Sequence, residues 1–503
     1  MASSQDTVAA ASAERSSELG RGAALWLALC AMACRILQVQ AFPIYDDAFI
    51  TFRYARHLAA GDGMVFNPGA PWEPVLGTTT PLYAALLALP ALLGVAIPLA
   101  SLAINVLCDG ASAYLIARLG AARPLATSFA VLAFAALPVI GRISVGGMEV
   151  PLFALLCVGA VHALRSERPA LAGLCTGLAC TTRPEGVLVL AVLAVFELRT
   201  LARARRFFLP VSVVGIAAFT ILRSYYGDPI PQSVQAKAST HGLGWEFSRA
   251  LLVLERGLWP SPEIWLGLPL VVAGLVLALR HSLRSVAIVG FGMLAAYAAA
   301  GAKTWGWYFY VPLLAWCVAF GEGAAAALSV ALRGRAAALR IRVGRAVVLC
   351  AALLALAGSL GLAFVRRDRV TDSVYAAMET WCKEQDTLGR QPTILATDIG
   401  AIGWYSRTRI LDSEALVWPA ARAYERQVDA LRVELPDYAL VVVNRARMLP
   451  LREDPIAARY EPVARFSTYG LTRDAVDLEP RLDLLVDGWT PDYILYRRKP
   501  AGD

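Results

Sequence analysis

The apolar run Ala23-Ala-Leu-Trp-Leu-Ala-Leu-Cys-Ala-Met-Ala-Cys-Arg-Ile-Leu-Gln-Val-Gln-Ala-Phe42 is followed closely by Tyr45-Asp-Asp-Ala-Phe-Ile-Thr-Phe-Arg-Tyr-Ala55. The first stretch is long enough to cross the roughly 30 Å core of a bilayer as a helix, and no convincing cleavage site follows it. We therefore expect a retained membrane span. Arg35 interrupts this span, and we expect simple packing or snorkelling for its side chain. Two adjacent carboxylates, Asp46 and Asp47, then stand at the membrane boundary.

The composition of the whole chain also indicates a membrane protein. Of its 503 residues, 57% are hydrophobic, which is more than a soluble domain can bury. The net charge of +8 comes from Lys and Arg in short loops between apolar segments, whereas residues 366–503 carry about as many acids as bases. We therefore predict no nucleic-acid partner. Eight of the nine cysteines lie in apolar segments, so neither a disulfide framework nor a Cys-x-x-Cys metal site is implied.

The apolar segments predict a mainly α, polytopic membrane protein with about eleven transmembrane helices, with an error of two. Besides the first span, crossings are expected near residues 99–119, 125–141, 151–165, 169–182, 186–199, 207–225, 262–279, 285–302, 308–330 and 345–365. The positive-inside rule assigns the basic loops to the cytoplasm, together with the N-terminal tail 1–20, which we expect to be disordered. The opposite face then holds loops 43–80, 142–150, 183–186, 226–260 and 303–307, and the chain after Arg366.

One apolar stretch, Pro81 to Leu119, does not fit a simple count of spans. Its 39 residues could cross twice, but Arg118 and Arg123 at its end require a single crossing. We therefore expect Pro81 to about Leu93 to lie at the membrane surface or to dip in and out.

The last part of the chain has a different pattern. The alternating runs Tyr438-Ala-Leu-Val-Val-Val-Asn444 and Tyr493-Ile-Leu-Tyr496 predict strands, and residues 374–384 have helical periodicity. The predicted plan is a tail at 1–20, a transmembrane core at 21–365 with outer loops 43–80 and 226–260, and a small extramembrane α/β domain at 366–503.

The unusual polar residues all fall on the outer face once this topology is assigned. After the Asp pair, the pattern predicts an interfacial helix over residues 48–60 whose two sides differ: Phe49, Ile50, Phe52 and Tyr54 on one, Arg53, Arg56 and His57 on the other. Taken alone, Asp47 is also compatible with a helix N-cap.

Other outer loops add further polar residues to the same face. Glu149 ends the loop 142–150, and Arg183 and Glu185 flank a proline in Thr182-Arg-Pro-Glu-Gly186. That proline ends one helix and begins the next, so both side chains can face a cavity, although a simple Arg183–Glu185 pair is the alternative. In the tail, Asp398 suits a strand-to-turn role as well as it suits contact with a substrate.

Carboxylates and cations at the outer membrane surface, with no phosphate-binding glycine loop and no obvious metal cluster, are suited to glycosyl transfer from a lipid phosphate. Nucleotide sugars are made in the cytoplasm, so an enzyme outside would take its sugar from a polyprenyl-phosphate donor. One carboxylate can deprotonate the acceptor hydroxyl while Lys or Arg stabilises the departing phosphate. Glycosidases differ, because they need two carboxylates.

The motifs of this chain resemble those of the C superfamily of glycosyltransferases (GT-C), in the group that includes the mycobacterial terminal arabinofuranosyltransferase of arabinogalactan synthesis. The resemblance covers most of the chain and rests on the following stretches: Tyr45–Tyr54, Gly61-Asp-Gly-Met-Val-Phe-Asn67-Pro-Gly69, Thr79-Thr-Pro-Leu82, Gly147-Met-Glu149, Thr182–Gly186, Tyr226-Gly-Asp-Pro-Ile-Pro231, Lys237 and Asp398-Ile-Gly-Ala-Ile-Gly403. It implies a multispan core, a catalytic acid on the first outer loop, a decaprenyl-phosphate-type donor, and a C-terminal domain that helps to bind the acceptor. Where relatives commonly have Val-Glu-Gly-Tyr-Thr, this chain has Val75-Leu-Gly-Thr-Thr79, which leaves the sugar open.

We therefore predict an inverting glycosyltransferase of the inner (plasma) membrane. It would move a sugar, arabinofuranosyl by the nearest analogy, from a polyprenyl-phosphate donor to a cell-envelope glycan or glycoconjugate, with the C-terminal domain periplasmic or extracellular. Either Asp46 or Asp47 is expected to be the base, with the other orienting it or helping to hold a divalent cation if one is used. We expect donor-phosphate contacts from Arg183, Lys237, Arg53 and Lys303, and sugar or acceptor contacts from Glu149, Glu185, Tyr226 and Asp398.

Two other classes of protein are compatible with many spans and interrupted helices. A transporter or flippase of a lipid-linked or small anionic substrate would gather its polar residues near the bilayer midplane rather than on one face. A noncatalytic subunit that binds the lipid carrier would still support envelope assembly after substitution of Asp46 and Asp47.

Overall fold

The computed structural model describes residues 18–232, 261–300, 304–366, 371–385, 392–443, 454–467, 470–473 and 492–500. The chain divides into two compact units, which we describe separately. Unit 1 comprises Met1–Phe42, Ser101–Ala218 and Leu243–Arg367, and unit 2 comprises Pro43–Ala100, Phe219–Gly242 and Asp368–Asp503. The predicted first outer loop therefore belongs to the same unit as the C-terminal sheet.

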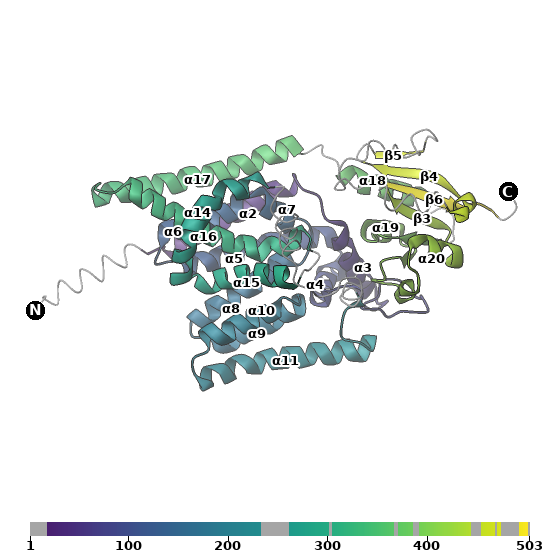
Figure 1. Ribbon diagram of the computed structural model, residues 1–503, viewed down its shortest axis with the longest axis horizontal. Helices are drawn as coiled ribbons and strands as arrows, with labels where there is room; N and C mark the ends of the chain where they lie inside the picture. The colour runs from purple at the N-terminus through teal and green to yellow at the C-terminus, as the bar shows by residue number, and fades with distance from the viewer. Residues whose placement is uncertain are drawn as a thin grey trace, which may run out of the picture. The chain divides into compact units, whose positions relative to one another are not determined.

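Unit 1 is built from apolar helices (Figure 1). Many of them begin with a proline, such as Pro124, Pro138 and Pro169, because the first helical residue needs no partner for an N–H group. In chain order the helices of this part are α2 (Arg21–Val39), α5 (Ile97–Leu119), α6 (Pro124–Ala136), α7 (Pro138–Ser144), α8 (Val150–Arg165), α9 (Pro169–Thr182), α10 (Gly186–Glu197), α11 (Leu201–Tyr226), α14 (Pro262–Arg280), α15 (Arg284–Ala300), η1 (Gly306–Phe309), α16 (Tyr310–Ala331) and α17 (Ala337–Arg366). The first residues of α5, up to Ala100, and the last residues of α11, from Phe219, belong to unit 2.

Six of the described helices are long and apolar enough to cross a membrane, or seven if the bent pair α6 and α7 is one span. The six are α2, α5, α11, α14, η1 with α16, and α17, whereas α8, α9, α10 and α15 are shorter apolar helices. Each segment that the sequence predicts to cross is largely helical over its described residues, with 125–141 forming the bent pair α6 and α7, and this confirms a mainly α, multi-pass membrane protein. The number of crossings, about eleven, stays a prediction.

Glycines allow the central helices of unit 1 to approach closely. A Cβ atom at Gly274 of α14 would collide with the carbonyl of Ala319 in α16, and one at Gly323 of α16 would collide with the carbonyl of Leu270 in α14. Small residues let helix backbones pack tightly in a membrane, where lipid removes the usual hydrophobic drive between helices.

Unit 2 carries a six-stranded mixed sheet in the order β2-β1-β3-β6-β4-β5 (Figure 1). Strands β1, β2 and β3 are parallel, and β3, β6, β4 and β5 pair antiparallel. The elements are α3 (Asp46–Ala60), α4 (Pro81–Leu92), α18 (Thr371–Gln385), β1 (Thr393–Ala396), α19 (Gly400–Ser406), β2 (Arg409–Asp412), η3 (Pro419–Ala423), α20 (Gln427–Glu434), β3 (Tyr438–Val442), η4 (Pro455–Arg459), β4 (Tyr460–Ser467), β5 (Gly470–Thr472) and β6 (Tyr493–Arg498). The predicted small α/β arrangement is confirmed, and both predicted strands are present as β3 and β6.

The stretch Pro81 to Leu119 divides into two helices. Helix α4 has 12 residues and is therefore about 18 Å long, which is shorter than the core of a bilayer. It packs against α3, with Tyr83 and Leu87 fully buried, and α5 is long enough to span. A surface or dipping position for α4 stays a prediction.

Candidate active site

The Asp pair occupies the first turn of α3. Tyr45 is the N-cap residue, so the alternative that Asp47 is only an N-cap is wrong. Carboxylates are favoured in the first turn because the unpaired N–H groups give a helix N-terminus a partial positive charge. The two acids differ in environment, because Asp46 is half-buried and Asp47 is exposed.

Asp46 is held by the N-terminus of α19, 354 residues further along the chain. Its Oδ2 accepts the N–H of Gly400 at 2.9 Å, and its Oδ1 accepts the N–H of Ala401 at 2.8 Å. A Cβ atom at position 400 would collide with the backbone carbonyl of Asp46, so only glycine permits this approach. The motif Asp398–Gly403 therefore has a structural role as the partner of the Asp pair.

Burial raises the pKa of Asp46 to about 7, with smaller contributions from the negative charges of Asp398 and Asp47. The two backbone N–H groups oppose this shift because they stabilise the ionised form. Asp398 in turn accepts a hydrogen bond from the hydroxyl of Tyr493 at 3.1 Å. The structure thus places the carboxylates of Asp47 and Asp398 close enough to Asp46 to act on its charge.

Arg53 of α3 is fully buried rather than exposed on a polar helix side. Its Nε donates to the carbonyl of Phe66 at 2.6 Å, its Nη2 to the carbonyl of Thr408 at 2.6 Å, and its Nη1 to the carbonyl of Gly403. The predicted helix is present as α3, but its basic side is largely buried, with Arg53 1% and His57 8% exposed, and its interfacial position stays a prediction. Burial lowers the pKa of Arg53 to about 9.

The loop between α3 and α4 is shaped by residues that the sequence analysis did not single out. Glu73 accepts the N–H groups of Phe66 and Asn67 on Oε1, at 3.1 and 2.8 Å, and that of Val75 on Oε2 at 2.7 Å. The side chain of Asn67 accepts the N–H of Ile410 at 2.9 Å and donates to its carbonyl at 3.0 Å. Asn67 could have been found as the polar residue within the motif Gly61–Gly69, whereas Glu73 has no comparable signal.

Tyr226 also contacts this loop, through a hydrogen bond from its hydroxyl to the carbonyl of Met64 at 2.7 Å. Lys237, the other predicted site residue of the outer loop 226–260, lies outside the described residues, and so does Lys303. Among the described residues, five of the predicted site residues lie in unit 2: Asp46, Asp47, Arg53, Tyr226 and Asp398.

The three other predicted site residues that the structure describes, Glu149, Arg183 and Glu185, form a second polar cluster, in unit 1. Arg183 donates from Nη1 to Oε1 of Glu149 at 2.5 Å. It also donates to Glu185, from Nε to Oε2 at 3.2 Å and from Nη2 to Oε1 at 3.0 Å. Tyr297 donates from its hydroxyl to Glu185 at 3.0 Å, and the guanidinium lies 5.0 Å from the centre of the Tyr308 ring. The pairing of Arg183 with Glu185 is present, and Glu149 joins it.

This cluster has little free positive charge. One guanidinium faces two carboxylates, all three side chains are at most 11% exposed, and Arg183 lowers the pKa of Glu185. Burial outweighs the same cation at Glu149 and raises its pKa. Three of the five N–H donors of Arg183 are thus engaged by carboxylates, and its charge is offset by theirs.

Among the described residues, no group of three or more His, Cys, Asp or Glu side chains is arranged to hold a metal ion. The predicted site residues are divided between unit 1 and unit 2, and their gathering in a single pocket stays a prediction.

Comparison with known proteins gives two family matches. Residues 78–300 match glycosyltransferase family 87, and residues 363–484 match a domain of unknown function, DUF8728. A search of curated proteins finds no match.

Several solved structures are similar to this chain at low sequence identity, and the first two below share its fold. The structure of ArnT from Cupriavidus metallidurans bound to undecaprenyl phosphate is 12% identical with a TM-score of 0.57, and the similarity covers 95% of this chain and 98% of that one. The oligosaccharyltransferase of Archaeoglobus fulgidus is 14% identical with a TM-score of 0.53, over 90% of this chain and 72% of that one. The arabinofuranosyltransferase AftD from Mycobacteria is 15% identical, with a TM-score of 0.48 over 94% of this chain and 40% of that one.

Proposed function

We propose that this chain, which has the GT-C glycosyltransferase fold predicted from its motifs, transfers a sugar from a polyprenyl-phosphate donor to a cell-envelope glycan or glycoconjugate. The match to glycosyltransferase family 87 supports the reaction class. The undecaprenyl phosphate bound to ArnT supports a lipid-phosphate donor, because the two chains share their fold over nearly their whole lengths. A site on the outer face of the plasma membrane follows from the distribution of basic loops.

The observation that carries the proposal is the unequal environment of the two acids on α3. A general base needs a lone pair within hydrogen-bond reach of the acceptor hydroxyl. Both oxygens of Asp46 already accept backbone N–H groups, whereas the side chain of Asp47 is exposed. We therefore assign Asp47 as the base and Asp46 as the residue that orients it.

The proposed step inverts the anomeric carbon. The acceptor oxygen bonds to that carbon from the side opposite the phosphate while its proton passes to Asp47. The bond from the carbon to the phosphate oxygen breaks, and its electron pair leaves with the phosphate. Cations stabilise that developing charge, and Lys237 and Lys303 remain our predicted phosphate ligands.

We propose a different use for the Glu149–Arg183–Glu185 cluster. Arg183 binds Oε1 of Glu149 and both oxygens of Glu185, which fixes the orientation of the two carboxylates. Such carboxylates are suited to accept hydrogen bonds from sugar hydroxyl groups. Tyr226 and Asp398 are proposed for the acceptor side, since they lie in the unit that contains Asp47.

Membrane fractions supplied with radiolabelled polyprenyl-phosphoryl sugars and candidate acceptors would test this assignment. We expect Asp47→Asn to lower transfer roughly 10²- to 10⁴-fold with donor binding retained, because only the base is lost. Asp46→Asn should have a smaller effect, about tenfold, because asparagine keeps one acceptor oxygen. Asp62→Asn removes an exposed acid at the other end of α3 and is the control. Unchanged transfer in Asp47→Asn would exclude the assignment.

A further inference from the structure

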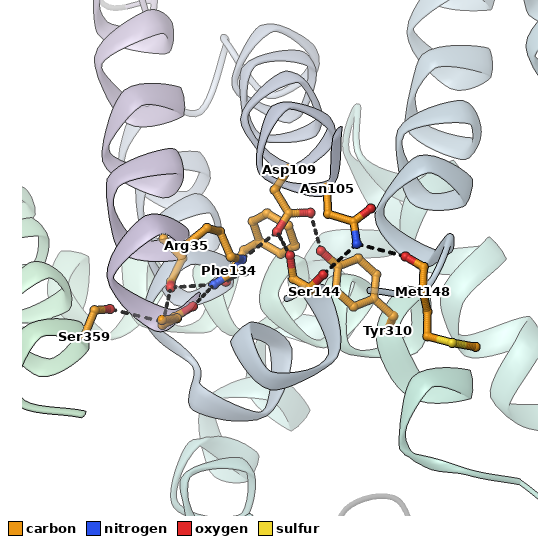
Figure 2. Close-up of polar contacts among 10 residues, drawn as sticks. Arg35, Asn105, Asp109, Phe134, Ser144, Met148, Tyr310 and Ser359 are labelled. Atoms are coloured by element: carbon orange, nitrogen blue, oxygen red, sulfur yellow. Dashed lines mark hydrogen bonds and ion pairs between the residues drawn. The ribbon is translucent and has the colours of Figure 1, made fainter. Parts of the chain in front are cut away.

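A fully buried ion pair lies inside unit 1, between Arg35 of α2 and Asp109 of α5 (Figure 2). Nε of Arg35 donates to Oδ2 of Asp109 at 2.5 Å, and neither side chain is exposed. Of the two expectations for Arg35, snorkelling is wrong, because the side chain is packed inside unit 1 with a charged partner. Removing two charges from water is costly, and such pairs persist where further hydrogen bonds satisfy both groups.

The other N–H groups of Arg35 donate to backbone carbonyls at the break between α6 and α7. Pro138 has no N–H group, so the carbonyl of Phe134 loses its helical donor. Arg35 donates to that carbonyl from Nη2 at 2.6 Å and to the carbonyl of Ala135 from Nη1 at 2.9 Å. The two helices meet at 63°. Backbone that is not helical is tolerated at membrane depth only where the protein supplies such partners.

Helix α5 holds the other end of this bent pair. Ser101, Asn105 and Asp109 are spaced four residues apart, so they lie on one helix face over about 12 Å, and all three are fully buried. Asn105 donates from Nδ2 to the carbonyls of Ser144 and Met148, both at 2.9 Å (Figure 2). Ser101 donates to the carbonyl of Gly147 at 3.1 Å, and the hydroxyl of Ser144 donates to Asp109 at 2.8 Å.

These contacts converge on the turn that leads into Glu149. The turn begins where α7 ends at Ser144, and Gly147 adopts a φ of +81° within it. Glu149 follows directly, as the N-cap residue of α8, and reaches Arg183. The carbonyl of Met148, which Asn105 binds, belongs to the peptide that joins Met148 to Glu149.

We propose that Asn105, supported by Ser101 and Asp109, is a positioning residue that fixes residues 144–148 and thereby sets the place of the Glu149 carboxylate against Arg183. Its effect on the reaction rests on the role proposed above for Glu149. Its effect on the turn depends only on the contacts within unit 1.

Hydrogen exchange on the full-length protein in detergent tests the structural part. Asn105→Ala removes two hydrogen bonds to the turn, and we expect the amides of residues 145–149 to exchange about tenfold faster or more. Ser112→Ala is the matched control, because Ser112 is equally buried on α5 and its hydroxyl has no hydrogen-bond partner within the part of the chain that the structure describes. Ser101→Ala, which removes one bond, should give a smaller rise in the same amides if Asn105→Ala fails to fold. Unchanged exchange at these amides would overturn the proposal.

A double-mutant cycle tests the functional part. If Asn105 acts through Glu149, then Asn105→Ala lowers kcat/KM for the donor in the wild type and changes it less than twofold in a Glu149→Gln background. Additive losses would overturn the proposal. If Glu149→Gln retains full activity while exchange at the turn still rises in Asn105→Ala, the role of Glu149 in the proposed function fails and the positioning of the turn stands.

Discussion

At the scale of single residues, the two adjacent acids of α3 differ in exposure, because Asp46 is half-buried and Asp47 is exposed. Asp46 accepts two backbone N–H groups from α19, beside Asp398 and the phenol groups of Tyr375 and Tyr493. Burial keeps both phenols protonated at neutral pH by raising their pKa. Of these groups, we therefore expect the Asp46 carboxyl to change its protonation near neutral pH.

The raised pKa of Asp46 predicts a dependence of stability on pH. Its pKa is about 7 in the folded protein against a usual 3.8, so folding favours the protonated form. The stabilisation is complete below about pH 4 and is lost as pH rises through about 7. We expect the unfolding temperature to fall over this window, and to fall less steeply in Asp46→Asn. Burial also raises the pKa of Asp412 to about 7, so part of the fall in unfolding temperature with pH should remain in Asp46→Asn. Identical slopes in wild type and variant would contradict the prediction.

The contacts of Arg53 predict a structural rather than a phosphate-binding role. Arg53→Lys keeps the charge but cannot reach three separate carbonyls, and each buried oxygen left without a donor costs about 1–3 kcal/mol. We expect a lower unfolding temperature by tryptophan fluorescence. Arg56→Lys is the control, since Nη1 of Arg56 donates to one carbonyl, that of Trp404, at 2.8 Å, and its guanidinium lies 4.4 Å from the centre of the Trp404 ring. A raised KM for donor with unchanged stability would instead support the predicted phosphate contact.

At the scale of helices, the Arg35–Asp109 pair joins α2 to α5 and supports the break between α6 and α7. Arg35→Met leaves a buried carboxylate without its cation, which typically costs about 3–5 kcal/mol. The double variant Arg35→Met/Asp109→Leu removes both charges and should recover much of that loss. Thermal unfolding in detergent, followed by size-exclusion chromatography, would measure both. A double variant no more stable than Arg35→Met would show that the carbonyls of Phe134 and Ala135, rather than the unpaired charge, dominate.

At the scale of the whole molecule, the proposed topology places the C-terminal sheet outside the cell membrane and the basic loop near Arg335 in the cytoplasm. Both positions offer exposed residues for cysteine labelling, Val433 on α20 and Arg335 itself. We expect a membrane-impermeant maleimide to label Val433→Cys in intact spheroplasts and Arg335→Cys only after permeabilisation, with Cys350→Ser as the background. The reverse pattern would exclude an outward-facing site and, with it, the proposed donor chemistry.

The amino-acid sequence alone determined the helices of unit 1, strands β3 and β6, and the GT-C resemblance, because hydropathy and periodicity are local properties of the chain. It also singled out Asp46, Glu149, Arg183 and the glycines after Asp398. Only the tertiary structure decided what these residues contact. Asp46 meets Gly400 across 354 residues and Arg35 meets Asp109 across 74, and no local pattern records such pairs. For the same reason the helical pattern of α3 could not show that Arg53 is buried, because the carbonyls that it binds include those of Gly403 and Thr408, far along the chain.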